Sequence, residues 1–206
     1  MYWTKNTYRP QLQNESTETD NKPPLKKRKR TILKEYSELV CTENKKTSDY
    51  IIDSDGYVNV YTDGACSSNG YKTAQAGIGV WFGDNHPLNV SEAVVGRATN
   101  NVAEIQAVIV AAKQAKKAGI KNLKIITDSK FLISCINIWM RKWKTNGWIT
   151  TANKPVINKV ELLEMEEALK SLNVAWNHVN GHVGIHGNEM ADKLARAGVL
   201  KNLKNS

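Results

Sequence analysis

The chain has 206 residues and a formal net charge of +9, and its 41% hydrophobic residues suffice for one globular domain with additional segments. No apolar run reaches the roughly 18 residues that a membrane span needs, and residues 1–10 lack the apolar stretch of a secretory signal. Three scattered cysteines without a C-x-x-C pair exclude a disulfide framework. We therefore expect an intracellular protein that does not span a membrane.

The positive charge belongs mainly to the C-terminal part of the chain. Residues 1–57 carry 11 Lys and Arg against 9 Asp and Glu, a net charge of +2, which leaves +7 for residues 58–206. A basic excess in a folded region favours a polyanionic partner such as nucleic acid. The alternative is that the charge only keeps the domain soluble, as in many basic proteins.

Residues 1–56 are predicted to form a disordered tail, because stretches such as residues 14–24 contain almost nothing to bury. Within this tail, Lys26–Arg30 is a compact basic run, typical of a nuclear-import signal or an auxiliary nucleic-acid contact. The alternative is a solvated charge cluster in a linker. An import signal would indicate the nucleus, and otherwise the cytoplasm or a mitochondrion stays open.

A folded domain is predicted for residues 57–200, followed by a short tail at 201–206. It begins with alternation that turns Val58, Val60 and Thr62 to one side. The predicted strands are residues 57–62, 76–82, 88–95, 123–127 and 174–179, and the predicted helices are 100–118, 129–140, 160–171 and a last one from about 188. This order indicates an α/β fold whose mixed five-stranded sheet combines a three-stranded antiparallel meander with parallel strands, flanked by helices.

Four acidic residues stand where these elements begin or end. Asp63 and Asp128 follow strands, Glu104 is expected in the first turn of the first long helix, and Asp192 in the first turns of the last helix. Such positions converge on one edge of an α/β sheet. Packed carboxylates repel one another unless a cation lies among them, and an all-oxygen set suits Mg²⁺. The alternative is that the helical acids complement helix dipoles and the other two are turn residues.

The sequence blocks around these acids carry a resemblance to a known family. They read YTDGAC (61–66), TNNVAE (99–104), ITDS (126–129) and GHVGIHGNEMAD (181–192). Any one block is common, but in this order and on this pattern of strands and helices the set is highly specific. Residues 57–198 resemble the ribonuclease H family, and its cellular type 1 enzymes more than the retroviral ones. The resemblance implies the ribonuclease H-like fold and an endoribonuclease that hydrolyses the RNA strand of RNA–DNA hybrids.

The resemblance also implies a set of metal ligands. Matched residue by residue, two Mg²⁺ ions, or Mn²⁺ as a substitute, would be held by Asp63, Glu104, Asp128 and Asp192. In a two-metal mechanism one ion activates the attacking water and the other stabilises the leaving 3′ oxygen. The products would then carry a 5′-phosphate and a 3′-hydroxyl, and no small-molecule cofactor besides the metal is implied.

His182 matches the family histidine that assists proton transfer or product release, which a side chain titrating near neutral pH can do. His178, His182 and His186 are spaced by four residues, a spacing that on a helix would suggest a zinc site. The glycines among them break any helix over this segment, so a zinc site is disfavoured. His178 and His186 are therefore expected to be structural.

A nucleic-acid surface is implied as well. The matching positions are Asn69, Asn100 and Asn101 for the minor groove, and Arg97, Thr99 and Asn158 for a phosphate of the DNA strand. Short amides suit base edges and the 2′-hydroxyls that distinguish RNA from DNA. The fork geometry of an arginine suits a phosphate.

The tract Trp139–Trp148, in which tryptophans alternate with cations, resembles the basic protrusion of the family. Tryptophans beside cations provide stacking surfaces for bases and sugars. The expected channel for the DNA strand comprises Phe131, Trp139 and Trp143, with Thr150 and Thr151 beside it. Trp148 is expected to brace the protrusion instead.

Three points remain open at this stage. Residues 1–56 lack the patterning of the hybrid-binding domain that eukaryotic relatives often carry, so that domain is expected to be absent or truncated. A module that binds hybrid or double-stranded RNA without cleaving it is one alternative function. A nuclease acting on other nucleic acids is another, because related folds serve integrases and exonucleases. We expect a monomer, as is usual in the family.

Overall fold

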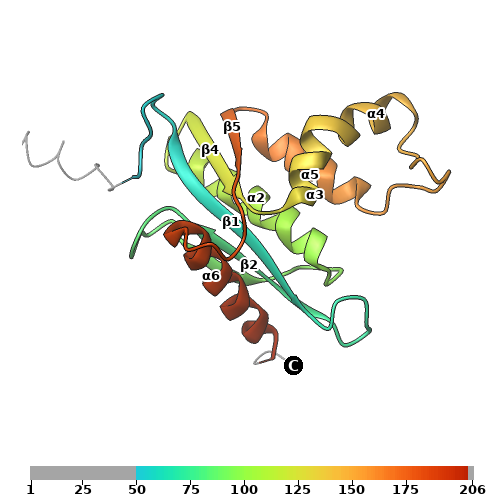
Figure 1. The fold of residues 1–206 in the computed structure, drawn as a ribbon, viewed down its shortest axis with the longest axis horizontal. Helices are drawn as coiled ribbons and strands as arrows, with labels where there is room; N and C mark the ends of the chain where they lie inside the picture. The colour runs from blue at the N-terminus through green and yellow to red at the C-terminus, as the bar shows by residue number, and fades with distance from the viewer. Residues whose placement is uncertain (1–49, 204–206) are drawn as a thin grey trace, which may run out of the picture. The chain divides into compact units, whose positions relative to one another are not determined.

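The structure is a computed structural model that describes residues 50–203. Its centre is a five-stranded sheet with the strand order β3-β2-β1-β4-β5 (Figure 1). The strands are β1 (Val58–Ser67), β2 (Gln75–Trp81), β3 (Val90–Ala93), β4 (Asn122–Thr127) and β5 (Asn173–His178). β1 pairs antiparallel with β2 and β2 with β3, whereas β1 pairs parallel with β4 and β4 with β5. The predicted mixed sheet is confirmed.

The helices form a layer on each face of this sheet. They are α2 (Asn100–Lys117), α3 (Lys130–Ser134), the π-helical turn η1 (Cys135–Trp139), α4 (Met140–Thr145), α5 (Lys159–Leu169) and α6 (His186–Leu203). α6 packs on β1, β2 and β3, whereas α2 packs on β1, β2 and β4 and is itself covered by α5. Figure 1 shows α6 and α2 on opposite sides of β1 and β2. None of the helices within residues 50–203 is long and apolar enough to cross a membrane.

The core forms because the sequence places apolar side chains on both faces of the central strands. In β1, Val58 and Val60 are buried whereas Asn59 is only half-buried, as the alternation predicts. α2 contributes a broad apolar surface, since Val102, Ile105 and Val108 are completely or almost completely inaccessible. The hydroxyl of Thr99 accepts a hydrogen bond from the Val102 amide (3.3 Å) and so caps the beginning of α2.

Two predicted boundaries are wrong in ways that affect the functional site. β1 does not end before Asp63 but continues to Ser67, because β2 pairs with it as far as Ser67↔Gln75. The helix predicted to end at Met140 continues to Thr145, so part of the tryptophan-rich tract is helical. β3 is also shorter than predicted, since only four of its residues are paired.

The folded part also begins before the predicted boundary at Tyr57. Ile52 forms a β-bridge with Val58, and the carbonyl of Ile51 accepts a hydrogen bond from the Asn59 amide (2.8 Å). Tyr50 packs against the core, and Asp53 forms an ion pair with Lys124 on β4. At the other end, α6 continues to Leu203, past the predicted boundary at residue 200. The remainder of the predicted tail, residues 1–49, lies outside the described residues.

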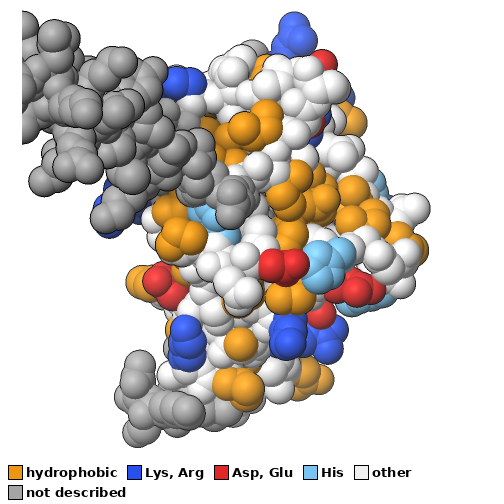
Figure 2. Space-filling view, turned by 90° about the vertical axis from the view of Figure 1, so that its left-hand side faces the viewer, with side chains coloured by type: hydrophobic (Ala, Val, Ile, Leu, Met, Phe, Trp, Pro, Cys, Tyr) orange, Lys and Arg blue, Asp and Glu red, His pale blue; other side chains and the backbone are white. Residues whose placement is uncertain are grey.

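Charged side chains of both signs share the surface of the domain. Figure 2 shows one face on which acidic and His side chains lie beside Lys and Arg side chains. The excess of Lys and Arg side chains is therefore not gathered into a single patch on that face.

Candidate functional site

The structure brings together three of the four predicted acids, Asp63, Glu104 and Asp128. Each offers a carboxylate oxygen, and the three oxygens lie within 4.8 Å of one another. Asp63 and Asp128 meet because β1 and β4 are parallel neighbours. Their paired register ends at Tyr61↔Ile126, and the same register two residues further on sets Asp63 opposite Asp128.

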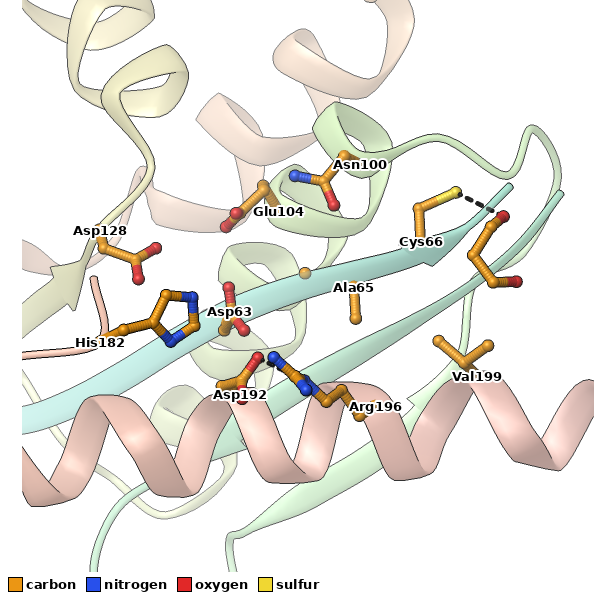
Figure 3. Close-up of a pocket in the computed structure, with 12 residues that line it drawn as sticks. Asp63, Ala65, Cys66, Asn100, Glu104, Asp128, His182, Asp192, Arg196 and Val199 are labelled. Atoms are coloured by element: carbon orange, nitrogen blue, oxygen red, sulfur yellow. Dashed lines mark hydrogen bonds and ion pairs between the residues drawn. The ribbon is translucent and has the colours of Figure 1, made fainter. Parts of the chain in front are cut away.

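Glu104 reaches this pair because α2 passes unusually close to β1. A Cβ atom on Gly64 would lie only 2.4 Å from the backbone nitrogen of Glu104, so only glycine permits this approach. Glu104 is the fifth residue of α2 rather than part of its first turn, which corrects the predicted position. Its carboxylate points towards Asp63 and Asp128 (Figure 3), so it serves the cluster and not the helix N-terminus.

The three acids lie in an electrostatically unfavourable environment. The exposed fraction of Asp63 is 8% and that of Glu104 is 4%. Burial, together with the charges of Asp128 and Asp192, raises the pKa of Asp63 to about 7. Burial and the charges of Asp63 and Asp128 raise the pKa of Glu104 well above its usual range, although the Gly64 amide acts in the opposite direction. Such a cluster calls for a cation.

The donor set fits a hard divalent cation. All three groups offer oxygen, which Mg²⁺ prefers. The buried Oε2 atom of Glu104 accepts no hydrogen bond from any residue that the structure describes. A buried carboxylate oxygen without a partner is costly, and coordination to a metal ion would satisfy it.

Asp192 lies on the wall of the same cavity but outside the three-acid set. Its Oδ1 atom accepts a hydrogen bond from the Nε atom of Arg196, one helical turn later (2.9 Å), as Figure 3 shows. α6 can pack this closely on β2 because Gly79 of β2 has no side chain. A Cβ atom on Gly79 would lie only 2.0 Å from the carbonyl oxygen of Ala191. The four predicted ligands therefore form a cluster of three and a fourth that is already paired.

The cavity around these acids has a volume of about 520 Å³. His182 lines it from the loop before α6 and is exposed, with its backbone in the left-handed region (φ 57°). Figure 3 shows its ring directed towards the acids. The neighbouring histidines lie elsewhere, because His178 ends β5 and His186 begins α6, where it pairs with Asp84 (3.0 Å).

Sequence reasoning missed Asn188, which supports the cluster from α6. It is 2% exposed, and its Nδ2 atom donates a hydrogen bond to Oδ2 of Asp128 (2.9 Å). Groups that orient metal ligands in this way are a regular part of metal sites. An asparagine near a helix start is usually interpreted as a cap, which is why its position in the fourth block gave no signal.

The three predicted minor-groove amides are exposed near the end of β1 and the beginning of α2. The side-chain oxygen of Asn69 accepts a hydrogen bond from the Asn100 amide (3.3 Å), which joins the β1–β2 loop to α2. Asn100 also lines the cavity that contains the acids, whereas Asn101 is the next residue of α2. The amides therefore border the acids, and their role in binding stays a prediction.

The predicted phosphate pocket is also partly assembled. The Nη2 atom of Arg97 donates a hydrogen bond to Oδ1 of Asn158 and forms an ion pair with Glu161 (3.4 Å). Thr99, two residues later, uses its hydroxyl to cap α2. A phosphate at Arg97 would therefore have to compete with Glu161, and the hydroxyl of Thr99 already has a partner.

The aromatic residues predicted to form the DNA-strand channel lie in a row along α3, η1 and α4, and the row continues to Trp148 in the following loop. The centroids of Phe131 and Trp139 are 6.1 Å apart, those of Trp139 and Trp143 5.6 Å, and those of Trp143 and Trp148 6.1 Å. The exposed fraction falls from 37% at Trp139 to 8% at Trp148, so the expected bracing position of Trp148 is confirmed. The threonines follow in the next loop, with Thr150 half-buried and Thr151 exposed.

Comparison with known proteins decides the family. The RNase H family model matches residues 55–200, which is most of the chain. The chain belongs to the RNase H family. Ribonuclease H1 of Mus musculus is 48% identical over 162 residues, which are 79% of this chain and 56% of the mouse protein. The chain thus spans about half of the length of this relative.

A bacterial RNase H is matched over almost its whole length. The Ribonuclease H of Bradyrhizobium diazoefficiens is 42% identical over 151 residues, covering 70% of this chain and 90% of the bacterial protein. Among solved structures, LC9-RNase H1, described as a type 1 RNase H with the type 2 active-site motif, superposes with a TM-score of 0.55 at 25% identity and covers 69% of this chain and 72% of its own. The expected ribonuclease H-like fold is confirmed.

Proposed function

We propose that the chain is an RNase H that uses divalent cations to hydrolyse the RNA strand of RNA–DNA hybrids. The observation that carries this proposal is the buried cluster of Asp63, Glu104 and Asp128, with the unpartnered Oε2 atom of Glu104. It lies in a chain of the RNase H family whose mouse and bacterial relatives bear the name of that activity.

The four acids would together hold two Mg²⁺ ions, or Mn²⁺ ions as a substitute. Asp63, Glu104 and Asp128 would hold one ion, and Asp192 would join them for a second. When bound, the ions supply a polarised attacking water and stabilise the leaving 3′ oxygen, so the products carry a 5′-phosphate and a 3′-hydroxyl. The chain itself contributes the rigid spacing of three carboxylates, fixed by β1, β4 and α2, and a hydrogen bond from Asn188 that orients Asp128.

His182 is proposed to move protons at the rim of this site. It is exposed on a loop and lines the cavity with the acids. A histidine in contact with water can donate a proton to a leaving oxygen and regain it from solvent.

The hybrid would be gripped on both sides of the acids. Asn69, Asn100 and Asn101 would contact the minor groove and the 2′-hydroxyls of the RNA strand. Arg97, Thr99 and Asn158 would hold a phosphate of the DNA strand, and the row of rings from Phe131 to Trp143 would stack on its sugars and bases, with Thr150 and Thr151 beside it. A binding module without catalysis is disfavoured, because three mutually repelling carboxylates, two of them buried, serve no purpose in one.

A digestion panel tests the proposal. Labelled RNA–DNA hybrid, duplex RNA and duplex DNA are incubated with the protein, each with Mg²⁺ and with a chelator. We expect rapid cleavage of the RNA in the hybrid, only with Mg²⁺, and fragments that carry a 5′-phosphate. Binding without cleavage would support a binding module, and equal cleavage of duplex DNA would support a nuclease of broader substrate range.

We further propose a monomeric enzyme that enters the nucleus through the basic run Lys26–Arg30, which lies outside the described residues. The basis is the sequence of that run. A fluorescent fusion in which the five residues are replaced by Gln is expected to lose its nuclear signal. An unchanged nuclear signal would refute import through this run, and light scattering of the purified protein measures the oligomeric state.

A further inference from the structure

The fourth acid of the site differs from the other three in having a charged partner within the chain. Asp63, Glu104 and Asp128 form the compact set, and no ion pair involves them among the described residues. Asp192 instead accepts a hydrogen bond from Nε of Arg196 at 2.9 Å. Before any cation binds, the site therefore consists of three carboxylates without an ion-pair partner among the described residues and a fourth that is paired with Arg196.

Arg196 is not merely a distant surface residue. Its side chain is 66% exposed, against 25% for that of Asp192, yet it lines the same cavity as the acids. Figure 3 shows it between the acidic end of the cavity and the end formed by Cys66 and Val199. Its charge reaches Asp63, whose pKa Arg196 lowers while burial and the other acids raise it.

We propose that Arg196 is a positioning residue that holds the Asp192 carboxylate apart from the three-acid cluster until a second divalent cation competes for it. The inference rests on the proposed metal-dependent cleavage at this site and concerns the order in which the site is loaded. The first cation meets three carboxylates that have no ion-pair partner among the described residues, whereas the second must compete with the Arg196 guanidinium for the Asp192 carboxylate. The second site is thus weaker than the first and fills at higher cation concentration.

An exposed i, i+4 ion pair is worth little by itself, but its replacement changes the second site specifically. Arg196→Gln frees Asp192 and removes a positive charge that repels the second cation. From the usual strength of an exposed pair we expect the second site to bind Mn²⁺ about two- to five-fold more tightly. The first site is made by acids that Arg196 does not contact and feels only its charge near Asp63, so its affinity changes less.

The test is a Mn²⁺ titration of the purified full-length protein in which free Mn²⁺ is followed by electron paramagnetic resonance. Four proteins form a double-mutant cycle: wild type, Arg196→Gln, Asp192→Asn and the double variant. Lys193→Gln is the matched control, because it removes the same charge from an exposed position of α6 one residue after Asp192. Thermal melts confirm that each variant is folded.

We expect Arg196→Gln to tighten the weaker site more than the first site and Lys193→Gln to change neither site. The effect of Arg196→Gln on the weaker site should vanish when Asp192 is Asn. An unchanged Mn²⁺ isotherm in Arg196→Gln would overturn the inference. So would an effect that persists in the Asp192→Asn background, or an unchanged isotherm with a raised KM for hybrid, which would make Arg196 a substrate contact. Hybrid cleavage by the wild type is scored separately, so failure of the proposed activity is distinguishable from failure of this inference.

Discussion

The acidic site and the aromatic protrusion (residues 131–148) are built on opposite principles. In the site, carboxylates are fixed by the sheet and by a close helix–strand contact, and Asp63 and Glu104 are almost completely buried. In the protrusion, the rings follow a helical segment, and their exposed fraction falls from 37% at Trp139 to 8% at Trp148. Catalytic side chains need positions that the buried backbone fixes, whereas a surface that binds a long polymer needs only exposed area and charge.

The two regions also affect stability in opposite directions. Without a cation, the carboxylates of the site repel one another and cost free energy of folding. The inner rings of the protrusion contribute to the core, since Trp148 is 8% exposed and belongs to the buried apolar cluster. Mutations in the site should therefore impair activity and leave stability unchanged or raise it. Mutations of the inner residues of the protrusion should lower stability and impair activity less.

The largest effect is expected for Glu104→Gln. Loss of one charge from the cluster should lower kcat for hybrid cleavage by roughly 10³-fold, the scale of several kcal/mol of transition-state stabilisation. The same change should raise the melting temperature of the metal-free protein at pH 8, because a buried charge is removed, with a smaller gain as the pH falls and the carboxyl becomes protonated. Cleavage rates and thermal melts check both, and a melting temperature lowered at pH 8 would contradict the account.

Asn188→Ala should have an intermediate effect. Removal of the hydrogen bond to Asp128 leaves that carboxylate free to rotate, and comparable changes around metal ligands cost about 10- to 100-fold in metal affinity or activity. We expect the Mg²⁺ concentration for half-maximal cleavage to rise. Glu189→Gln, at the exposed neighbouring position, serves as the control and should leave it unchanged.

The outer and inner tryptophans should separate binding from stability. Trp139→Ala should weaken hybrid binding about ten-fold through loss of stacking and lower the melting temperature less than Trp148→Ala does, because Trp139 is more exposed. Trp148→Ala should destabilise the fold by about 3 kcal/mol, since it empties a buried site. Hybrid affinity is measured by fluorescence anisotropy with labelled hybrid in the absence of divalent cations, and the free energy of unfolding by urea denaturation. Equal effects of both substitutions on affinity and stability would contradict the separate roles of the outer and inner tryptophans.

A further effect concerns the pH dependence of the metal-free protein. With its pKa at about 7 in the folded state against an ordinary value of about 3.9 when unfolded, Asp63 makes the folded chain hold more protons than the unfolded one in this range. The free energy of unfolding should therefore fall as the pH rises from 4 to 7, by roughly 1 kcal/mol per pH unit. Urea denaturation in chelator should show this slope, and Asp63→Asn should reduce it.

Much of this molecule could be predicted from its sequence, because local patterns and motif blocks point to the same fold. The alternation around Val60 and the apolar surface of the helix opened by Asn100-Asn101 correctly predicted β1 and α2. The position of Asp128 at the end of β4 followed from the same strand pattern. These features depend on periodicity and turn chemistry, which a sequence displays directly.

Other features depend on tertiary contacts that no local pattern reveals. The extension of β1 beyond Asp63 results from pairing with β2, and the turn-forming residues after Gly64 concealed it. The N-terminal stretch at Tyr50–Asp53 is held by a bridge and a backbone hydrogen bond to β1 and by an ion pair with Lys124 on β4. The pairing of Asp192 with Arg196 followed helical spacing and could have been noticed, but only the structure shows that it separates Asp192 from the other acids.

The most direct test of the central claim is Asp128→Asn, which keeps the shape of the side chain and removes its charge from the cluster. Single-turnover cleavage of a labelled hybrid and binding of the same hybrid in chelator are measured side by side for the wild type and the variant. The account predicts that cleavage is lost whereas the dissociation constant stays within about two-fold of the wild-type value. An Asp128→Asn protein that still cleaves the RNA strand with Mg²⁺ would contradict it.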